Sequence, residues 1–252
     1  MKDNNEQITV DDGSGTSNMY ANATTPHASE FIMNSQVVNP GQSVEGVIKS
    51  VSSKYVHSIE WGIGTASESI VGCAGGTNVS LYVPDWWTEQ LKFSCKGDLK
   101  ITIRTYDDGE LVGSNVYTLD FVIPETDAYK PSFEMLLEKY DTVIPNGWNE
   151  WVQGISQMRV VPYNLVFKYG ATLAAVTITV GSVSKRTMPA VFELPESGTQ
   201  TVTFAIRDSR GMLTVKTTAI EVREYTPPSI DVRRLVRCLS DGTINSSGEN
   251  LF

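Results

Sequence analysis

The sequence is short of the residues on which most catalytic and metal-binding sites depend. It has two histidines and three cysteines in 252 residues. Cys73, Cys95 and Cys238 show no C-x-x-C spacing and have no histidine pair nearby, which excludes the common zinc patterns. No G-x-S-x-G or H-E-x-x-H occurs, and Gly62-Ile-Gly64 is not followed by a third glycine. We therefore expect no enzyme, no cofactor and no bound metal.

Long apolar runs and an excess of positive charge are absent too. No apolar run approaches 18 residues, and the start of the chain is polar and unlike a signal peptide. The net charge of −9 and the pI near 4.8 argue against binding to a phosphate backbone. We expect synthesis in a cytoplasm, no membrane insertion and no nucleic-acid partner. Pairing of Cys73 with Cys95 across a sandwich stays open, although reduced thiols are expected at synthesis.

Few residues remain as candidates for acid–base chemistry. His27 lies in a polar stretch, and His57 lies in an alternating strand, where a surface or rim histidine is expected rather than a catalytic base. Asp107, Asp108 and Glu110 crowd one turn, where such acids usually bond backbone amides, with calcium binding as the alternative. Glu134 and Glu138 lie close together on one strand-like run, whereas a glycosidase usually sets two carboxyls from distant segments across a cleft, so a glycan-cleaving enzyme stays open only through distant carboxylates.

Alternation of apolar and polar residues with a period of two fills most of the chain. This pattern predicts antiparallel sheets with one buried face. An Asp-Gly pair between two alternating runs is a hairpin signal. For residues 133–140 we favour a strand over a short helix, because Pro131 precedes them and the neighbours are β. Strands are expected at 44–51, 55–61, 78–83, 99–104, 111–123, 133–140, 158–161, 165–169, 176–180, 202–206 and 213–222.

An internal repeat divides the chain. Lys130-Pro-Ser-Phe133 matches Pro227-Pro-Ser-Ile230, each after a predicted hairpin, at the spacing of one Ig-like domain. We expect an all-β chain of tandem Ig-like antiparallel β-sandwiches with an extended polar N-terminal arm. The expected segments are the arm at 1–30, the first sandwich at 31–127, the second at 128–226, and the start of a third unit or a C-terminal strand at 227–252.

Tryptophans offer the main opportunity for binding. Trp61 is predicted to be the core tryptophan of the first sandwich. Trp86 and Trp87 follow Pro84-Asp85 in a segment that fits one helical turn, so one ring is expected to plug the sandwich end while the other faces out. That pair is the candidate glycan or partner contact. Trp148 and Trp151 are expected to pack across a domain junction.

One set of motifs resembles a known family. Trp148–Val160, Asp208-Ser-Arg-Gly211 and Tyr225–Ile230 are similar, in order, to the Ig-like repeats of phage tail and minor virion proteins from phages of Gram-positive bacteria. Val83-Pro-Asp-Trp-Trp87 resembles the preceding family repeat. The resemblance implies location in the virion, and a role in assembly or host-surface contact.

The leading hypothesis is therefore a non-enzymatic virion structural protein in the tail, tail tip, fibre or decoration. Its arm would dock on other virion proteins, and it would form a homo-oligomer. The alternative is a carbohydrate-binding adhesin module that recognises bacterial cell-surface glycans through Trp86 or Trp87. A glycan-cleaving enzyme is a third hypothesis.

Overall fold

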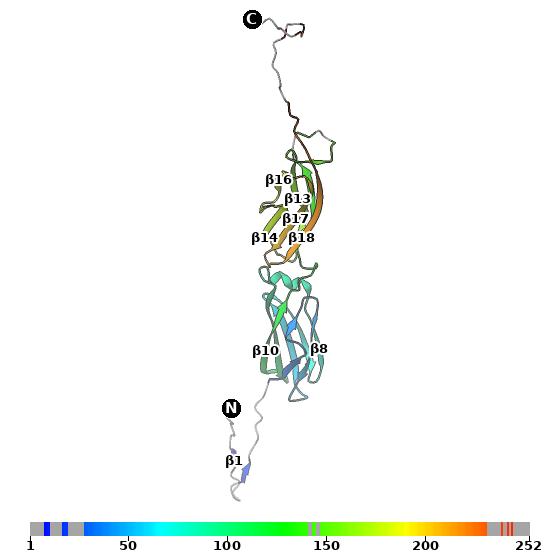
Figure 1. Ribbon diagram of the computed structural model, residues 1–252. Helices are drawn as coiled ribbons and strands as arrows, with labels where there is room; N and C mark the ends of the chain where they lie inside the picture. The colour runs from blue at the N-terminus through cyan, green and yellow to red at the C-terminus, as the bar shows by residue number, and fades with distance from the viewer. Residues whose placement is uncertain are drawn as a thin grey trace.

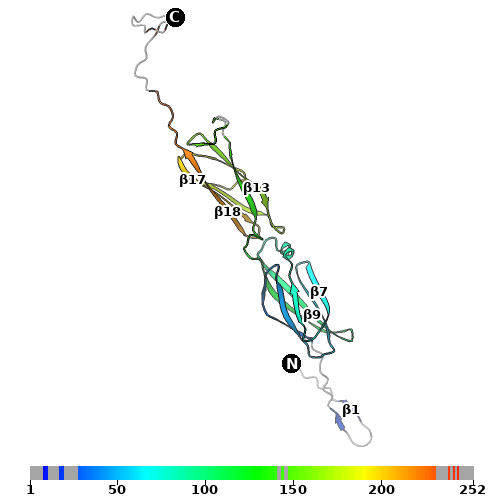
Figure 2. The ribbon, with the colours of Figure 1, turned by 90° about the vertical axis from the view of Figure 1, so that its right-hand side faces the viewer.

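The chain forms two β-sandwiches arranged end to end, so the prediction of an all-β tandem sandwich fold is confirmed (Figure 1). The structure is a computed structural model, and it describes residues 8–10, 17–19, 28–140, 143–144 and 147–230, with residues 238, 241 and 243. A view turned by 90° shows the same elongated arrangement (Figure 2).

The first sandwich packs a five-stranded sheet against a three-stranded sheet. The larger sheet has the order β4 (Val37–Val38), β10 (Glu110–Val122), β9 (Lys96–Asp107), β6 (Val56–Ile63) and β7 (Ala66–Ala74). The smaller sheet has the order β3 (Glu30–Met33), β5 (Ser43–Lys49) and β8 (Asn78–Tyr82). A 3-10 helix, η1 (Asp85–Gln90), connects β8 to β9.

The second sandwich repeats this topology strand for strand. Its larger sheet has the order β12 (Trp151–Val152), β18 (Leu213–Arg223), β17 (Gly198–Asp208), β14 (Leu173–Val180) and β15 (Val183–Lys185). Its smaller sheet has the order β11 (Ser132–Lys139), β13 (Gln157–Val166) and β16 (Ala190–Glu193).

The two sandwiches also share equivalent hydrogen bonds, one set within each sandwich. In each sandwich a short strand, β4 or β12, pairs in parallel with the end of the last strand. The chain then turns, and a glycine amide donates to the carbonyl that follows the third strand of the smaller sheet. These bonds join Gly41 to Val83 and Gly154 to Leu194, both at 2.8 Å. The second bond belongs to the Val152–Ser156 motif, so that motif is a structural turn.

Strand formation follows from the alternation that the sequence shows. On β9, Leu99, Ile101 and Ile103 are fully buried, and the residues between them face outward. Burying each such side chain contributes about 1.5–3 kcal/mol. Trp61 is buried in the same core, as predicted, and its indole nitrogen donates to the Tyr82 carbonyl at 2.8 Å.

The predicted Asp-Gly hairpin joins β9 to β10. Asp108 has φ 45° and Gly109 has φ 88°, which is the pair of positive values that a two-residue hairpin turn requires. Asp108 therefore adopts the left-handed conformation that this turn requires and that aspartate tolerates. Within the described residues, no group of three or more His, Cys, Asp or Glu side chains is placed to hold a metal ion.

Several strand predictions need correction. β3 and β4 precede the first expected strand, so Ser29 and Glu30 belong to the sandwich rather than to the arm. β7 and β15 were not expected, because they are edge strands whose mostly exposed side chains disturb the alternation. β16 was not expected either, although Ala190 and Phe192 alternate into the core, because it is only four residues long. The two strands expected within 158–169 are one strand, β13, while residues 132–139 form a strand as predicted.

Both ends of the chain lie largely outside the described residues. In the expected arm, β1 (Ile8–Val10) pairs with β2 (Ser17–Met19). In the expected third unit, Ile230 is 88% exposed, and most of 231–252 falls outside the described part. No helix within the described residues has the length and apolar character of a membrane span.

Candidate functional site: the junction between the sandwiches

The end of the first sandwich and the facing loops of the second form a shared structure, which we call the junction. From the first sandwich it takes η1 and residues 91–95. From the second it takes residues 168–172 and the β17–β18 turn at 208–212. The connecting segment contributes Tyr129.

The β17–β18 turn is fixed by its own first residue. The Asp208 Oδ1 atom accepts hydrogen bonds from the backbone amides of Arg210 (3.0 Å) and Met212 (2.9 Å). Gly211 adopts φ 90°, a value that favours glycine. Asp208 is itself buried. This arrangement holds the Arg210 side chain in one direction, toward the first sandwich.

Arg210 is the centre of the junction and is 6% exposed. Its Nε donates to the Leu91 carbonyl at 2.8 Å, and its Nη2 donates to the Thr88 carbonyl at 3.2 Å. Within the second sandwich it donates to the carbonyls of Lys168 (3.0 Å) and Tyr169. One guanidinium therefore satisfies backbone acceptors from both sandwiches. Burial lowers the pKa of Arg210, and the nearby Asp208 carboxylate opposes that shift.

Apolar and polar contacts surround this guanidinium. Met212 belongs to the core of the first sandwich although it lies on the second. The Ser209 hydroxyl donates to the Lys92 carbonyl, and the Cys95 thiol donates to the Arg210 carbonyl. Because buried polar groups bond across the boundary, the two sandwiches are held in one relative orientation.

Tyr129 closes the junction from the connecting segment. Its ring packs against Tyr169 with centroids 5.6 Å apart, and its hydroxyl donates to Asp85 Oδ1 at 2.5 Å. Burial, and then the hydrogen bond to Asp85, raises the pKa of Tyr129. Tyr129 is therefore a neutral donor to the residue that begins η1.

The paired tryptophans of η1 divide as expected, one inward and one outward. Trp87 is 0% exposed and plugs the first core, while Trp86 is 49% exposed. Their rings meet edge to face at 6.1 Å. The proposed glycan or partner contact at Trp87 is wrong, because a fully buried ring offers no face to a ligand. For Trp86 the contact stays a prediction.

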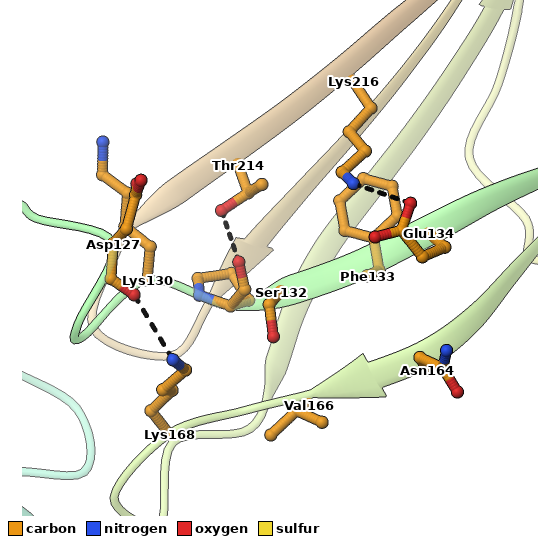
Figure 3. Close-up of a pocket in the computed structure, with 11 residues that line it drawn as sticks. Asp127, Lys130, Ser132, Phe133, Glu134, Asn164, Val166, Lys168, Thr214 and Lys216 are labelled. Atoms are coloured by element: carbon orange, nitrogen blue, oxygen red, sulfur yellow. Dashed lines mark hydrogen bonds and ion pairs between the residues drawn. The ribbon is translucent and has the colours of Figure 1, made fainter.

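A surface depression of about 600 Å³ lies beside the connecting segment, on the second sandwich (Figure 3). Lys216 Nζ donates to Glu134 at 2.9 Å on one side, and Thr214 donates to the Pro131 carbonyl at 2.6 Å. Glu138 bonds Arg159. The two carboxylates considered as a catalytic pair are thus each bound to a cation, which is the arrangement of a solvated ion pair.

His57 differs from its prediction. It is fully buried rather than on a surface or rim, and its ring nitrogens bond the Cys73 carbonyl (3.0 Å) and the Ser29 hydroxyl (2.8 Å). Ser29 is buried as well, and its amide donates to Thr105 Oγ1 at 2.9 Å. This serine–histidine contact fastens the start of the first sandwich and has no exposed face for a substrate.

The fold does not form two other contacts that the sequence suggested, a Cys73–Cys95 pair and packing of Trp148 and Trp151 across the junction. Cys73 lies beside His57, which pairs with Thr105 on β9, whereas Cys95 lies at the opposite end of that strand. Ten extended residues span about 33 Å, so the sandwich does not bring the two thiols together, and both are free. Trp148 and Trp151 lie at the end of the second sandwich away from the junction, where Trp151 pairs with Val222.

Comparison with known proteins gives a matching family model and a distant likeness to solved structures. The family model described as "Siphovirus protein of unknown function (DUF859)" matches residues 13–241. A solved structure titled "Structures of Clostridium thermocellum CbhA fibronectin(III)-like modules" is similar at 11% identity, with 77% of this chain and 95% of that chain covered. Its TM-score of 0.29 carries no argument about function. No curated protein matches the chain.

Proposed function

Because the chain belongs to this family of siphovirus proteins, we propose that it is a non-enzymatic structural component of the virion. Its two sandwiches form one rigid spacer in the tail, tail tip, fibre or decoration. The resemblance of residues 148–160 extends the proposal to phages of Gram-positive bacteria.

The Arg210 junction is the observation that carries this proposal. A flexible tether needs no buried polar contact between modules, whereas here one guanidinium bonds carbonyls on both sides. The chain enters near Ser29, at the β9–β10 hairpin end, and leaves at Arg223, beyond the far end of the second sandwich. The junction thus fixes the separation between whatever is attached at the two ends.

Paired charges support a structural role over a catalytic one. Glu138 and Glu60 each bond a cation from the neighbouring strand of the same sheet. Glu134 bonds Lys216 of the facing sheet. These carboxylates stabilise the sheet surface. A glycosidase instead needs two carboxyl groups that face each other across a sugar-binding cleft.

Localisation in the particle tests the proposal directly. Purified virions are examined by mass spectrometry and by electron microscopy with an antibody against residues 28–230. The expected result is stoichiometric recovery of the chain and labelling at one structural position. Absence from purified virions, with abundant chain in the infected lysate, rejects the virion role.

We propose further that residues 1–27 dock the chain on other virion proteins. The truncation ends at residue 27 because Ser29 and Glu30 are part of the sandwich. Phages lacking the gene are complemented with the full chain or with the chain lacking these residues. Loss of incorporation with an unchanged melting temperature supports docking, and unchanged incorporation rejects it.

Trp86 favours a second candidate function, binding to host cell-surface glycans. Its half-exposed indole is held in place by the buried Trp87 ring, and a preorganised aromatic face suits stacking on a sugar. A glycan array compares the intact chain with Trp86→Ala. Trp148→Ala is the matched control, because that indole is 56% exposed at the opposite end. No binding by the intact chain, or equal loss in both variants, rejects this candidate.

A further inference from the structure

The outer face of the larger sheet in the second sandwich differs in charge from the rest of this acidic chain. On β17, Val202, Phe204 and Ile206 are fully buried, so the residues between them face outward. The face consists of three rows across β14, β17 and β18, and among these described residues none is charged. The rows, which we call the threonine face, are Thr177–Ala205–Val215, Thr179–Thr203–Thr217 and Thr201–Ala219.

The fold itself does not require an uncharged face here. The two large sheets align through their last hairpins, since Ile206 pairs with Thr214 as Thr105 pairs with Gly113. Thr203 then matches Thr102 of the first sandwich. In this alignment Glu60, Lys100 and Arg104 occupy the positions of Thr179, Thr201 and Ala205. The same sheet thus carries an ion pair, Glu60–Arg104, in one sandwich and small uncharged residues in the other.

Charges at the ends of the threonine face indicate what covers it. Arg207 lies two rows from Thr203 toward the junction. Glu221, bonded to Thr199 at 2.5 Å, lies two rows from Thr203 in the other direction. A two-fold axis through the Thr203 row, perpendicular to the strands, therefore places Arg207 of one copy opposite the Thr199–Glu221 pair of the other. A parallel arrangement would place Arg207 opposite Arg207.

We propose that the threonine face binds a second copy of this chain, face to face and antiparallel, with two Arg207–Glu221 contacts at its ends. Opposite charges at the rim set the orientation of such a pair. The uncharged centre allows two copies of net charge −9 to approach without placing like charges together. Small side chains on both sheets suit the spacing of about 10 Å between packed sheets.

The size of the face sets the strength of the pair. Three strands at about 4.8 Å and three rows at about 6.8 Å give roughly 300 Å² per copy, less than half of the roughly 800 Å² typical of a stable interface. The association is therefore weak and reversible in solution. It uses the side of the second sandwich, so the junction and both ends of each chain stay free. This self-association does not depend on where the chain acts.

Sedimentation of the full chain at concentrations up to about 1 mM, under reducing conditions because Cys238 is exposed, measures the association. The expected result is a reversible monomer–dimer equilibrium. Thr203→Glu should weaken it by more than about tenfold, because two like charges meet at the centre. Thr102→Glu, the matched change on the first sandwich, should leave it unchanged. A chain that stays monomeric throughout, or equal loss in the two variants, overturns the proposal.

A charge exchange tests the antiparallel geometry separately. Glu221→Arg should weaken the dimer, and so should Arg207→Glu. The double variant should restore association to within about threefold of the parent, since the two charges have changed places. Melting temperatures verify that each variant is folded. Dimerisation that survives both single changes, or that the double change fails to restore, contradicts the antiparallel pair.

Discussion

The two sandwiches have the same strand order, but they differ in how the smaller sheet connects to the larger one. In the first, residues 83–95 join β8 to β9 and include η1. In the second, residues 194–197 make the equivalent connection from β16 to β17. The first residue of each connection, Val83 or Leu194, is fully buried in its core, so the sandwiches close in the same way up to that point.

The longer connection supplies the platform for the junction. Thr88, Leu91 and Lys92, whose carbonyls accept from the second sandwich, all lie in it. A surface connection can lengthen at small entropic cost, so a sandwich can gain a docking platform without a change in its core. The first sandwich's side of the junction is therefore formed by the longer connection at residues 83–95 and not by the strands of the sandwich.

The last hairpins of the two sandwiches differ in a complementary way. The β9–β10 turn at 107–110 is exposed, and the β17–β18 turn at 208–212 is largely buried against the platform. Both turns begin with an aspartate, yet only Asp208 accepts the two amides that aim an arginine at the neighbour. Two turns at the same position of the fold therefore have different roles, because only the β17–β18 turn packs against another sandwich.

The largest effect is expected from removing the buried Trp87 ring, which closes the end of the first core. Trp87→Ala should lower the free energy of unfolding by about 3–5 kcal/mol, because it leaves a cavity in the first core. Trp86→Ala should cost less than about 1 kcal/mol, since that ring is half exposed. Urea denaturation followed by circular dichroism measures both. Equal losses of unfolding free energy in the two variants would contradict the different roles of Trp87 and Trp86.

Breaking the joint itself should have the next largest effect. Arg210→Ala leaves buried carbonyls of both sandwiches without a donor, and should cost about 3 kcal/mol. Unfolding should separate into two transitions, and X-ray scattering should show a broader range of shapes. Arg223→Ala is the control, because its ion pair with Glu150 is exposed. A single transition and an unchanged scattering profile would contradict the coupling role of Arg210.

Tyr129→Phe should have a smaller, pH-dependent effect. Loss of the bond to Asp85 should cost about 1–2 kcal/mol at neutral pH. The folded chain holds the pKa of Tyr129 above its usual value of about 10. The hydrogen bond of Tyr129 therefore contributes fully to the free energy of unfolding below pH 10. Above pH 10 the unfolded chain loses the tyrosine proton while the folded chain keeps it, so this contribution falls as the pH rises toward the pKa of the folded chain.

The pH dependence is measured as a difference between two chains, because other tyrosines also titrate. The stability gap between parent and Tyr129→Phe should narrow above pH 10. Tyr140→Phe, which alters an exposed ring, should give a gap near zero at every pH. A gap for Tyr129→Phe that widens with pH would contradict the assigned hydrogen bond.

The smallest effect concerns the outer faces of the two large sheets. Glu60→Thr gives the first sandwich the residue that the second has at Thr179, and it breaks the Glu60–Arg104 ion pair. Both side chains are substantially exposed, so the loss should be less than about 1 kcal/mol and should shrink further in high salt. Thermal unfolding at two salt concentrations measures it. A larger, salt-independent loss would mean that the face contributes to the core.

Alternation made many strands predictable and edge strands hard to find. The strand β9 was predictable from Leu99, Ile101 and Ile103, because every second residue of this strand is buried in the core. β7 gave no such signal, since Ser67, Glu68 and Ser69 lie on an edge with little to bury. The alternating strand around His57 predicts a surface or rim position, but the ring is buried and bonds Ser29 and Cys73. A histidine's partners can be remote in sequence, and the local pattern does not reveal them.

The junction was visible in the sequence only as separate pieces. The Asp208–Gly211 motif and the paired tryptophans both stood out, but nothing local related one to the other. Tyr129 and Met212 gave no signal, because their burial depends on a surface from the other sandwich. Trp87 illustrates the limit: the sequence predicted that one ring of the pair would be buried, but only the tertiary structure decided that it is Trp87.

The order of residues along the chain determined two repeats of alternating strands, their hairpin turns and the acidic balance of the surface, because these depend on neighbours within a few positions. The tertiary structure alone decided that Arg210 would join the sandwiches and that one large sheet would present an uncharged face. Both outcomes arise where residues far apart in sequence meet, and a buried guanidinium is stable only when carbonyls from several such segments surround it.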